Sequence, residues 1–239
     1  MNFRGRALPM TADGLQRAAN VLSVPVHTMM AVLEVETCGC GFLADKRPVI
    51  LFERHIFSRR TGGQFDRAHQ DISCSEPGGY GSTGGVQYAR LGQAMKLHED
   101  AALYSTSWGL GQIMGFNYGR AAFPDVHTMI AAFCDSEDAQ LLAVANFILK
   151  SGLADELRKQ DWSAFAYGYN GPGFARNDYD AKLREAHRSW ARRGNPDCGV
   201  RAQQIALRDN GYYKGKLDGI CGPMMTAALE EARRCGFLA

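Results

Sequence analysis

The chain has 239 residues, of which 46% are hydrophobic and 22% are charged, and its formal net charge is +2. This composition is typical of a globular protein and lacks the clustered basicity of a nucleic-acid-binding protein, while no apolar run reaches the ~18 residues that a membrane-spanning helix needs. The N-terminus also lacks the apolar segment of a signal peptide, so we expect a soluble protein that is synthesised in a cytoplasm without an export signal and that does not insert into a membrane.

The length fits one large domain followed by a small one. Seven cysteines are present, an odd number, and a reducing cytoplasm favours free thiols over a disulfide framework. Cys38 and Cys40 are too closely spaced for a common zinc site, and no second cysteine pair with metal-binding spacing follows. We therefore expect neither a metal nor another cofactor.

Two helices are predicted at the start of the chain. Thr11 or Asp13 can cap the first one, which continues to about Leu22. Pro25 suits the first turn of the second helix, which continues to about Glu36, where a Gly-rich turn follows.

A β-rich segment and a long loop follow these helices. The run 48–55 comes after a short turn at 44–47, a pattern that predicts a small β-hairpin. Residues 58–87 are rich in Gly, Ser and Gln, and structureless loops of this length in compact domains are usually functional. Further helices are predicted at 88–103, 126–133, 136–151, 154–160 and 178–192.

The polar, turn-prone tract 192–197 predicts a domain boundary. The large domain would occupy residues 1–193, and a small helical unit would occupy residues 197–239. Some 40 residues make a poor core alone, so this unit must either pack on the large domain or be unusually compact.

One carboxylate in the second helix is a candidate general acid. At about 100° per residue, Val26, Met29 and Leu33 share one helix face, and Glu36 lies close to that face whereas Glu34 points toward solvent. Burial and the helix C-terminus both disfavour a negative charge at Glu36 and would raise its pKa, as acid catalysis near neutral pH requires. The alternative role is a glutamate at the edge of the core that pairs with an arginine.

Several motifs resemble those of known wall-degrading enzymes. Three segments in sequence order resemble the lysozyme superfamily, which includes goose-type lysozymes and lytic transglycosylases: Glu36-Thr37, Ser107–Met114 and Tyr167–Gly173. A larger set over residues 12–192 is similar to the N-acetylmuramidase family of phage endolysins: residues 36–42, Ile50–His55, Pro77–Gly81, Gln112–Met114, Ser136–Gln140 and Tyr169–Gly173.

This resemblance implies a mainly α, lysozyme-like α+β fold with a small β-hairpin at the catalytic cleft. It also implies cleavage of the β-1,4 bond between N-acetylmuramic acid and N-acetylglucosamine in bacterial peptidoglycan, for host cell lysis. The protein would act as a monomer that accumulates in the host cytoplasm and reaches the periplasmic wall through a holin-type partner.

Glu36 would protonate the glycosidic oxygen, and a second carboxylate would activate water or stabilise the cation. Glu53, in the predicted β segment, is one candidate, and a salt bridge to Arg54 or another arginine is its alternative role. Asp45, in the preceding turn, is the other candidate, although it also fits an ordinary turn residue.

The substrate would be bound by Ser107, Gln112, Tyr169 and Asn170, whose hydrogen-bonding and stacking groups suit an N-acetyl sugar. Ser107 could instead cap a helix, and Trp108 is expected in the core. His55 has no evident partners for a metal.

The C-terminal unit resembles a single, truncated repeat of a peptidoglycan-binding module, with an Asp-Gly-x-x-Gly-Pro turn at residues 218–223. Met225 and Cys221 depart from that pattern. The resemblance implies wall binding through Tyr212, Tyr213, Leu217 and Asp218. Two other functions stay open: a lytic transglycosylase that gives 1,6-anhydro products, and a non-catalytic wall-binding or virion protein.

Overall fold

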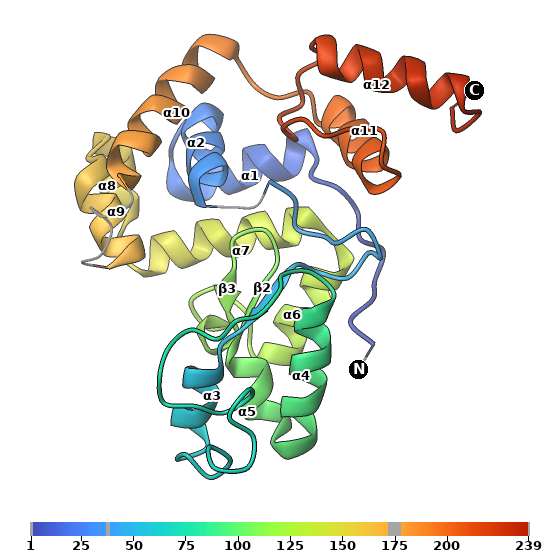
Figure 1. Cartoon of the computed structure of the whole chain (residues 1–239). Coiled ribbons are helices and arrows are strands. Elements are labelled where there is room, and N and C mark those ends of the chain that lie inside the picture. Colours follow the sequence, from blue (N-terminus) through green and yellow to red (C-terminus); the bar gives the residue numbers. More distant parts are fainter. Residues whose placement is uncertain (1, 37–38, 172–177, 239) are drawn as a thin grey trace.

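Short helices surround one small antiparallel sheet, and a computed structural model describes this fold for residues 2–36, 39–171 and 178–238, the side chain of Asn170 excepted (Figure 1). Its strands are β1 (Ile50–Phe52), β2 (Thr106–Trp108) and β3 (Ile113–Met114), and a 3₁₀ turn, η1 (Gly115–Asn117), follows them. The helices are α1 (Ala12–Leu22), α2 (Val26–Glu36), α3 (Arg54–Arg60), α4 (Val86–Leu97), α5 (Glu99–Tyr104), α6 (Val126–Asp135), α7 (Glu137–Lys150), α8 (Ala154–Lys159), α9 (Trp162–Asn170), α10 (Tyr179–Arg193), α11 (Cys198–Asp209) and α12 (Pro223–Arg234). The predicted fold class, mainly α with a small β element, is confirmed.

Local capping explains where several helices begin. Thr11 accepts a hydrogen bond from the backbone N–H of Gly14 (2.9 Å), and Asp125 and Ser136 cap α6 and α7 in the same way. The helix predicted at 88–103 is divided in two at His98, whose extended backbone ends α4 and whose side chain caps α5.

The sheet has the order β1-β2-β3, and both pairs are antiparallel. The predicted hairpin at 44–55 is therefore only partly right. The turn forms, since Phe42 and Pro48 make an isolated bridge, but β1 pairs with β2 more than fifty residues later. The predicted strand also ends early, because α3 begins at Arg54 and buries Phe57 in the core.

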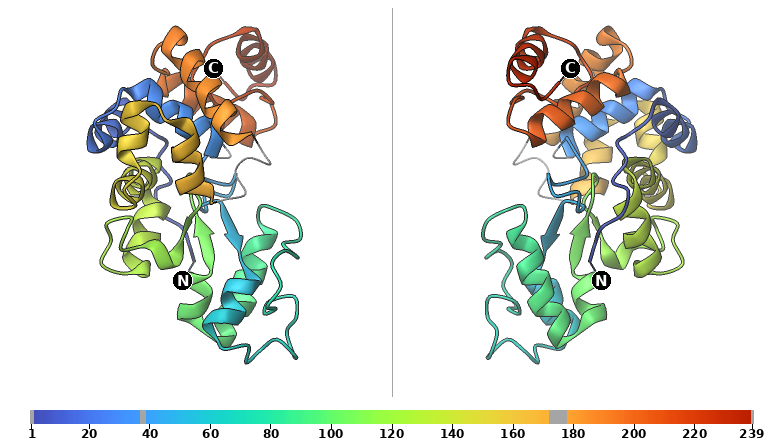
Figure 2. Two further views of the ribbon diagram at one scale, coloured as in Figure 1. Left: turned by 90° about the vertical axis from the view of Figure 1, so that its left-hand side faces the viewer. Right: turned by 90° about the vertical axis from the view of Figure 1, so that its right-hand side faces the viewer.

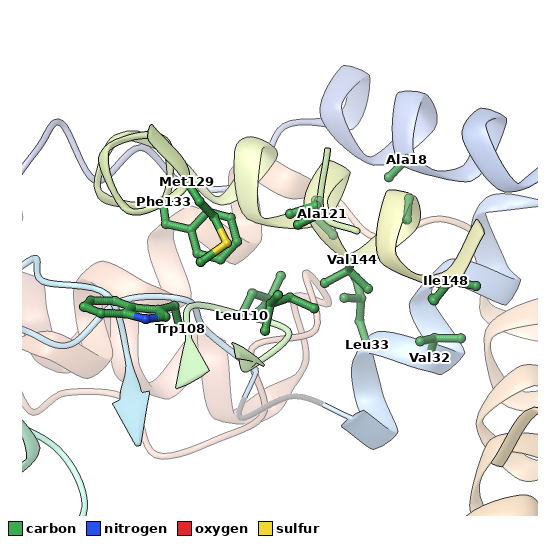
Figure 3. Close-up of a cluster of buried hydrophobic side chains, with 14 of the residues drawn as sticks. Ala18, Val32, Leu33, Trp108, Leu110, Ala121, Met129, Phe133, Val144 and Ile148 are labelled. Atoms are coloured by element: carbon green, nitrogen blue, oxygen red, sulfur yellow. The ribbon is translucent and has the colours of Figure 1, made fainter. Parts of the chain in front are cut away.

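One continuous core joins the helices to the sheet (Figure 3). Leu33 of α2, Leu110 of the β2–β3 turn and Val144 of α7 converge in it. Helix α2 packs against α1 and α10 and is buried at nearly every residue from Val26 to Leu33. A helix buried on all sides has little amphipathic signal, so the face assigned to Glu36 and Glu34 from periodicity alone is a weak guide.

The C-terminal unit contacts the rest of the chain through α11 and the turn after it, since Arg201 pairs with Glu137 of α7 and Lys216 pairs with Glu34 of α2. In both views of Figure 2, α3, α4 and α5 occupy one end of the molecule and α10, α11 and α12 the other, with the sheet between. This C-terminal unit has a small core of its own, formed by Leu207, Tyr213, Met225, Ala228 and Ala232. A second cluster, Cys40, Phe42 and Ile205, joins it to the larger domain.

None of the helices within the described ranges is by itself long and apolar enough to cross a membrane. Helices α1 and α2 pass such a test only when they are taken together, across a bend of 97°.

Candidate active site

Glu36 is the last residue of α2 and is half-buried. Burial and the charge of Glu36 both raise the pKa of Tyr169, so the two side chains lie within electrostatic range of each other. The Tyr169 ring stacks on Phe165 with a centroid distance of 5.4 Å and meets the edge of Phe147 at 5.8 Å. These contacts fix the ring inside an aromatic cluster, where its hydroxyl stays protonated.

Glu34 is exposed, as the helical wheel predicts, but its carboxylate is held by two partners. The indole N–H of Trp190 donates to its Oε2 (2.7 Å), and Lys216 Nζ lies 2.9 Å from its Oε1. Burial opposes ionisation of this carboxyl, but the two hydrogen bonds and the charges of Lys216 and Arg193 outweigh it and lower the pKa of Glu34. Glu34 therefore ties the last turn of α2 to α10 and to the C-terminal unit.

Ser107 and Gln112 hold the β2–β3 turn together. The Ser107 hydroxyl donates to Gln112 Oε1 (2.9 Å), and the Gln112 amide donates to the carbonyls of Gly109 (2.8 Å) and Val49 (3.2 Å). Ser107 is only 5% exposed, and Gln112 has a backbone φ of 47°. Sugar binding by these two residues stays a prediction. In this structure their polar groups stabilise the β2–β3 turn through hydrogen bonds.

Gln140 of α7 supports this turn from below. It is fully buried, its Oε1 accepts from the backbone N–H of Leu110 (2.6 Å), and its amide donates to the carbonyl of Phe133. A Cβ at Gly41 or Gly109 would collide with its side chain, at 1.9 Å and 2.7 Å. Glycine at both positions therefore lets two backbone segments approach α7.

Glu53 lies between β1 and α3, not within a strand. Its Oε2 is 3.1 Å from His55 Nδ1, both side chains are 16% exposed, and neither of these atoms makes a hydrogen bond with a described residue. Burial and the charge and hydrogen bond of Glu53 raise the pKa of Tyr80, so the Tyr80 hydroxyl contacts this carboxylate. In the described part of the chain no arginine is within ion-pair distance of Glu53, so the alternative role as an arginine anchor lacks its partner.

The loop that carries Tyr80 is fixed by polar side chains that the sequence analysis did not single out. Gln87 and Arg90 both donate to the carbonyl of Tyr80, at 2.7 Å and 2.5 Å. Gly79, with a φ of +67°, passes so close to Arg54 that a Cβ would lie 2.5 Å from its guanidinium carbon. Gln87 is fully buried, but the sequence did not predict this, because Gln87 directly follows a Gly-rich segment that was expected to be an exposed loop.

Asp45 is a turn residue. Its carboxylate accepts from the backbone N–H of Arg47 (3.1 Å) and from Arg47 Nε (2.7 Å). Trp108 is fully buried, which confirms the expectation that it belongs to the core.

The four residues predicted to contact the wall are mostly used inside the C-terminal unit. Tyr213 is 6% exposed and donates its hydroxyl to the carbonyl of Lys216, which leaves it unable to meet a wall polymer and corrects that prediction. Asp218 accepts from Gln204 and from the backbone N–H of Ile220, Tyr212 packs on Phe237, and Leu217 is half-buried between the two small clusters.

Four residues of the predicted motifs, Thr37, Cys38, Pro172 and Gly173, lie outside the described residues, as does the side chain of Asn170. No group of His, Cys, Asp or Glu side chains within the described ranges could hold a metal ion.

With this geometry in place, comparison with known proteins is informative. Residues 25–191 match a family model described as N-acetylmuramidase, which is more than half of the chain. The chain belongs to the N-acetylmuramidase family. The matched span contains Glu36, Glu53 and Tyr169 and ends before α11 and α12.

Two relatives are named as endolysins. The crystal structure of a Burkholderia AP3 phage endolysin is 40% identical with a TM-score of 0.72, and the match covers 78% of this chain and 72% of that one. The endolysin of Enterobacteria phage PRD1 is 36% identical over 93 residues, which is 36% of this chain. The chain spans 60% of the length of that curated relative.

Proposed function

We propose that this protein is a peptidoglycan hydrolase that cleaves the β-1,4 bond between N-acetylmuramic acid and N-acetylglucosamine during host lysis. Membership of the N-acetylmuramidase family and similarity to two phage endolysins support the class of activity. The observation that carries the proposal is the Glu36 carboxylate at the end of the buried helix α2, within electrostatic range of Tyr169.

Glu36 donates the proton to the leaving glycosidic oxygen. Tyr169 keeps its own proton at neutral pH, because burial and the Glu36 charge raise its pKa. Its hydroxyl can therefore donate a hydrogen bond to Glu36 and orient the carboxylate without competing as an acid. Asn170, the next residue of α9, is proposed to bind the N-acetyl sugar.

Glu53 is the proposed second carboxylate. It is largely buried, no described arginine lies within ion-pair distance of its carboxylate, and its Oε2 lies 3.1 Å from His55 Nδ1, with neither of these two atoms in a hydrogen bond to a described residue. Such atoms call for a water or a ligand partner. Asp45 is less suited, since Arg47 already engages its carboxylate.

The wider biology follows from the endolysin relatives and is proposed on that basis. Peptidoglycan is the substrate, synthesis occurs in the host cytoplasm, and a holin-type protein opens the way to the wall. The active form is a monomer. The C-terminal unit binds the wall through its exposed residues.

Glu36→Gln tests the role of the general acid. The substitution keeps the size and hydrogen-bonding shape of the side chain but removes the transferable proton, so the rate at which permeabilised Gram-negative cells lose turbidity should fall by at least ~10²-fold. Glu99→Gln is a matched control, because Glu99 is exposed in the first turn of α5 and should leave the rate unchanged. An active, folded Glu36→Gln protein would contradict the mechanism.

A further inference from the structure

A buried ion pair joins the C-terminal unit to the larger domain. Arg201 of α11 places Nη1 2.5 Å from Glu137 Oε2 and Nη2 3.1 Å from Oε1, with 3% of the arginine side chain and none of the glutamate exposed. A two-point contact of this kind fixes orientation as well as distance.

Two further segments of the chain, at Met10 and Gly41, donate backbone hydrogen bonds to the Glu137 carboxylate. The backbone N–H groups of Gly41 and Met10 donate to its two oxygens, each at 2.8 Å. Burial opposes ionisation of this carboxyl, but Arg201 and the two backbone donors outweigh it and lower the pKa of Glu137. The carboxylate is thus charged and fully partnered, and its partnership depends on a residue from outside the family-matched span.

The same unit contacts the chain on both sides of Glu36. Arg201 Nη2 donates to the carbonyl of Gly39 (2.6 Å), three residues after Glu36. Lys216 pairs with Glu34 (2.9 Å), two residues before it, and Trp190 donates to that same carboxylate. Helix α11 and the turn after it therefore fix the backbone that leads into and away from Glu36.

Apolar packing between the C-terminal unit and the larger domain, across the interface called the seam below, is limited. The shared cluster is small (Cys40, Phe42 and Ile205), and a cavity of about 300 Å³ remains between Leu33, Gly39 and Leu110 on one side and Arg201, Lys216 and Leu217 on the other. Because the seam is incompletely filled, the polar contacts determine how the two parts fit together.

We propose that Arg201 is a positioning residue for Glu36, and that α11 and the turn after it act as a clamp on the candidate active site. This rests on the proposed role of Glu36 as the general acid. Arg201 holds Gly39 directly and Gly41 through Glu137, so it limits how far the end of α2 can shift. Small misplacements of a catalytic group lower the rate of the chemical step far more than they lower substrate binding.

The test compares full-length variants on purified peptidoglycan, at a temperature where all of them are folded. Arg201→Met should lower kcat at least ~10-fold, leave the half-saturating substrate concentration close to wild type and shift the acid-dependent limb of the pH–rate profile. Arg201→Lys should recover part of kcat, because it restores the charge without the two-point geometry. Arg6→Met should change nothing, since its paired contact with Asp135 is an exposed one.

A double variant separates positioning from simple stability. Arg201→Met leaves a buried charge unpaired, and adding Glu137→Gln removes that charge, so the melting temperature should return toward wild type while kcat stays low. The positioning role would be overturned if the double variant recovered both its melting temperature and its kcat, or if Arg201→Met had a wild-type kcat. In either case an inactive Glu36→Gln protein would still support the proposed function. An active Glu36→Gln protein would overturn both.

Discussion

At the scale of single residues, the two candidate carboxylates differ in what surrounds them. Glu36 lies within electrostatic range of a tyrosine that is held in an aromatic cluster. Glu53 lies beside an imidazole and a second tyrosine, Tyr80, which is fixed by Gln87 and Arg90. The presence of a tyrosine near each carboxylate is a feature that spacing along the sequence did not predict, because both tyrosines come from distant segments.

Glu53→Gln is expected to lower wall lysis at least ~10-fold if this carboxylate activates water or stabilises the cation, because the amide cannot carry the charge. The melting temperature should change little, since no described arginine depends on Glu53 for its charge partner. Lysis rates and thermal unfolding of the same preparation check this. A folded variant with wild-type lysis, or one whose loss of activity follows its loss of stability, would remove Glu53 from the mechanism.

Residue roles that depend on local chemistry were predictable, and those that depend on distant partners were not. Trp108 was expected in the core and is buried there, and Asp45 fitted a turn. Glu34 is exposed as predicted, but a helical wheel carries no information about its partners Trp190 and Lys216, which lie 156 and 182 residues further along. Tyr213 was assigned to wall binding through the resemblance to a peptidoglycan-binding module, which carries no information about its burial in this chain.

At the scale of elements, helix ends were predicted well because capping residues determine them locally. The start of α1 after Thr11 and its end at Leu22 agree with the structure. The partner of β1 was not predictable, since strand pairing across a long loop leaves no local signal. Helix α3 was missed because its few residues continue an apolar run that also suits a strand.

The packing of α2 on α10 predicts a pH-dependent stability. The rings of His27 and His187 contact each other across it, with centroids 4.8 Å apart and planes tilted by 60°, and burial together with His27 lowers the pKa of His187 from its ordinary 6.5. A lowered pKa in the folded state gives stability that is present above 6.5 and lost as the pH falls through the lowered value. The melting temperature should therefore fall between pH 7.5 and 5.5, and less so in His187→Gln. Equal slopes in the two proteins would contradict this.

At the scale of the whole molecule, the C-terminal unit is part of how the larger domain is held. The boundary at 192–197 remains our proposed division of the chain, with residues 1–193 and 197–239 as the two parts. Sequence reasoning left open whether the unit packs on the large domain, and the buried pair of Arg201 and Glu137 shows that it does.

Truncation after Asn195 should therefore destabilise the remaining domain. Glu137 loses its charge partner, and breaking a buried pair in this way costs about 3–5 kcal/mol, less whatever water can recover at the newly exposed surface. Chemical denaturation of the truncated and full-length proteins measures the difference. Equal midpoints would mean that the unit is an independent appendage, as its resemblance to a wall-binding module first implied.

The sugar ends released from purified peptidoglycan test the proposed activity most directly. Hydrolysis adds one water and leaves N-acetylmuramic acid as a reducing end, whereas transglycosylation closes a 1,6-anhydro ring and lacks that water. Mass spectrometry of the products should find reducible N-acetylmuramic acid ends, and borohydride treatment should shift their masses. Anhydro ends would contradict hydrolysis, N-acetylglucosamine reducing ends would contradict the bond, and the absence of any soluble product would contradict an enzymatic function.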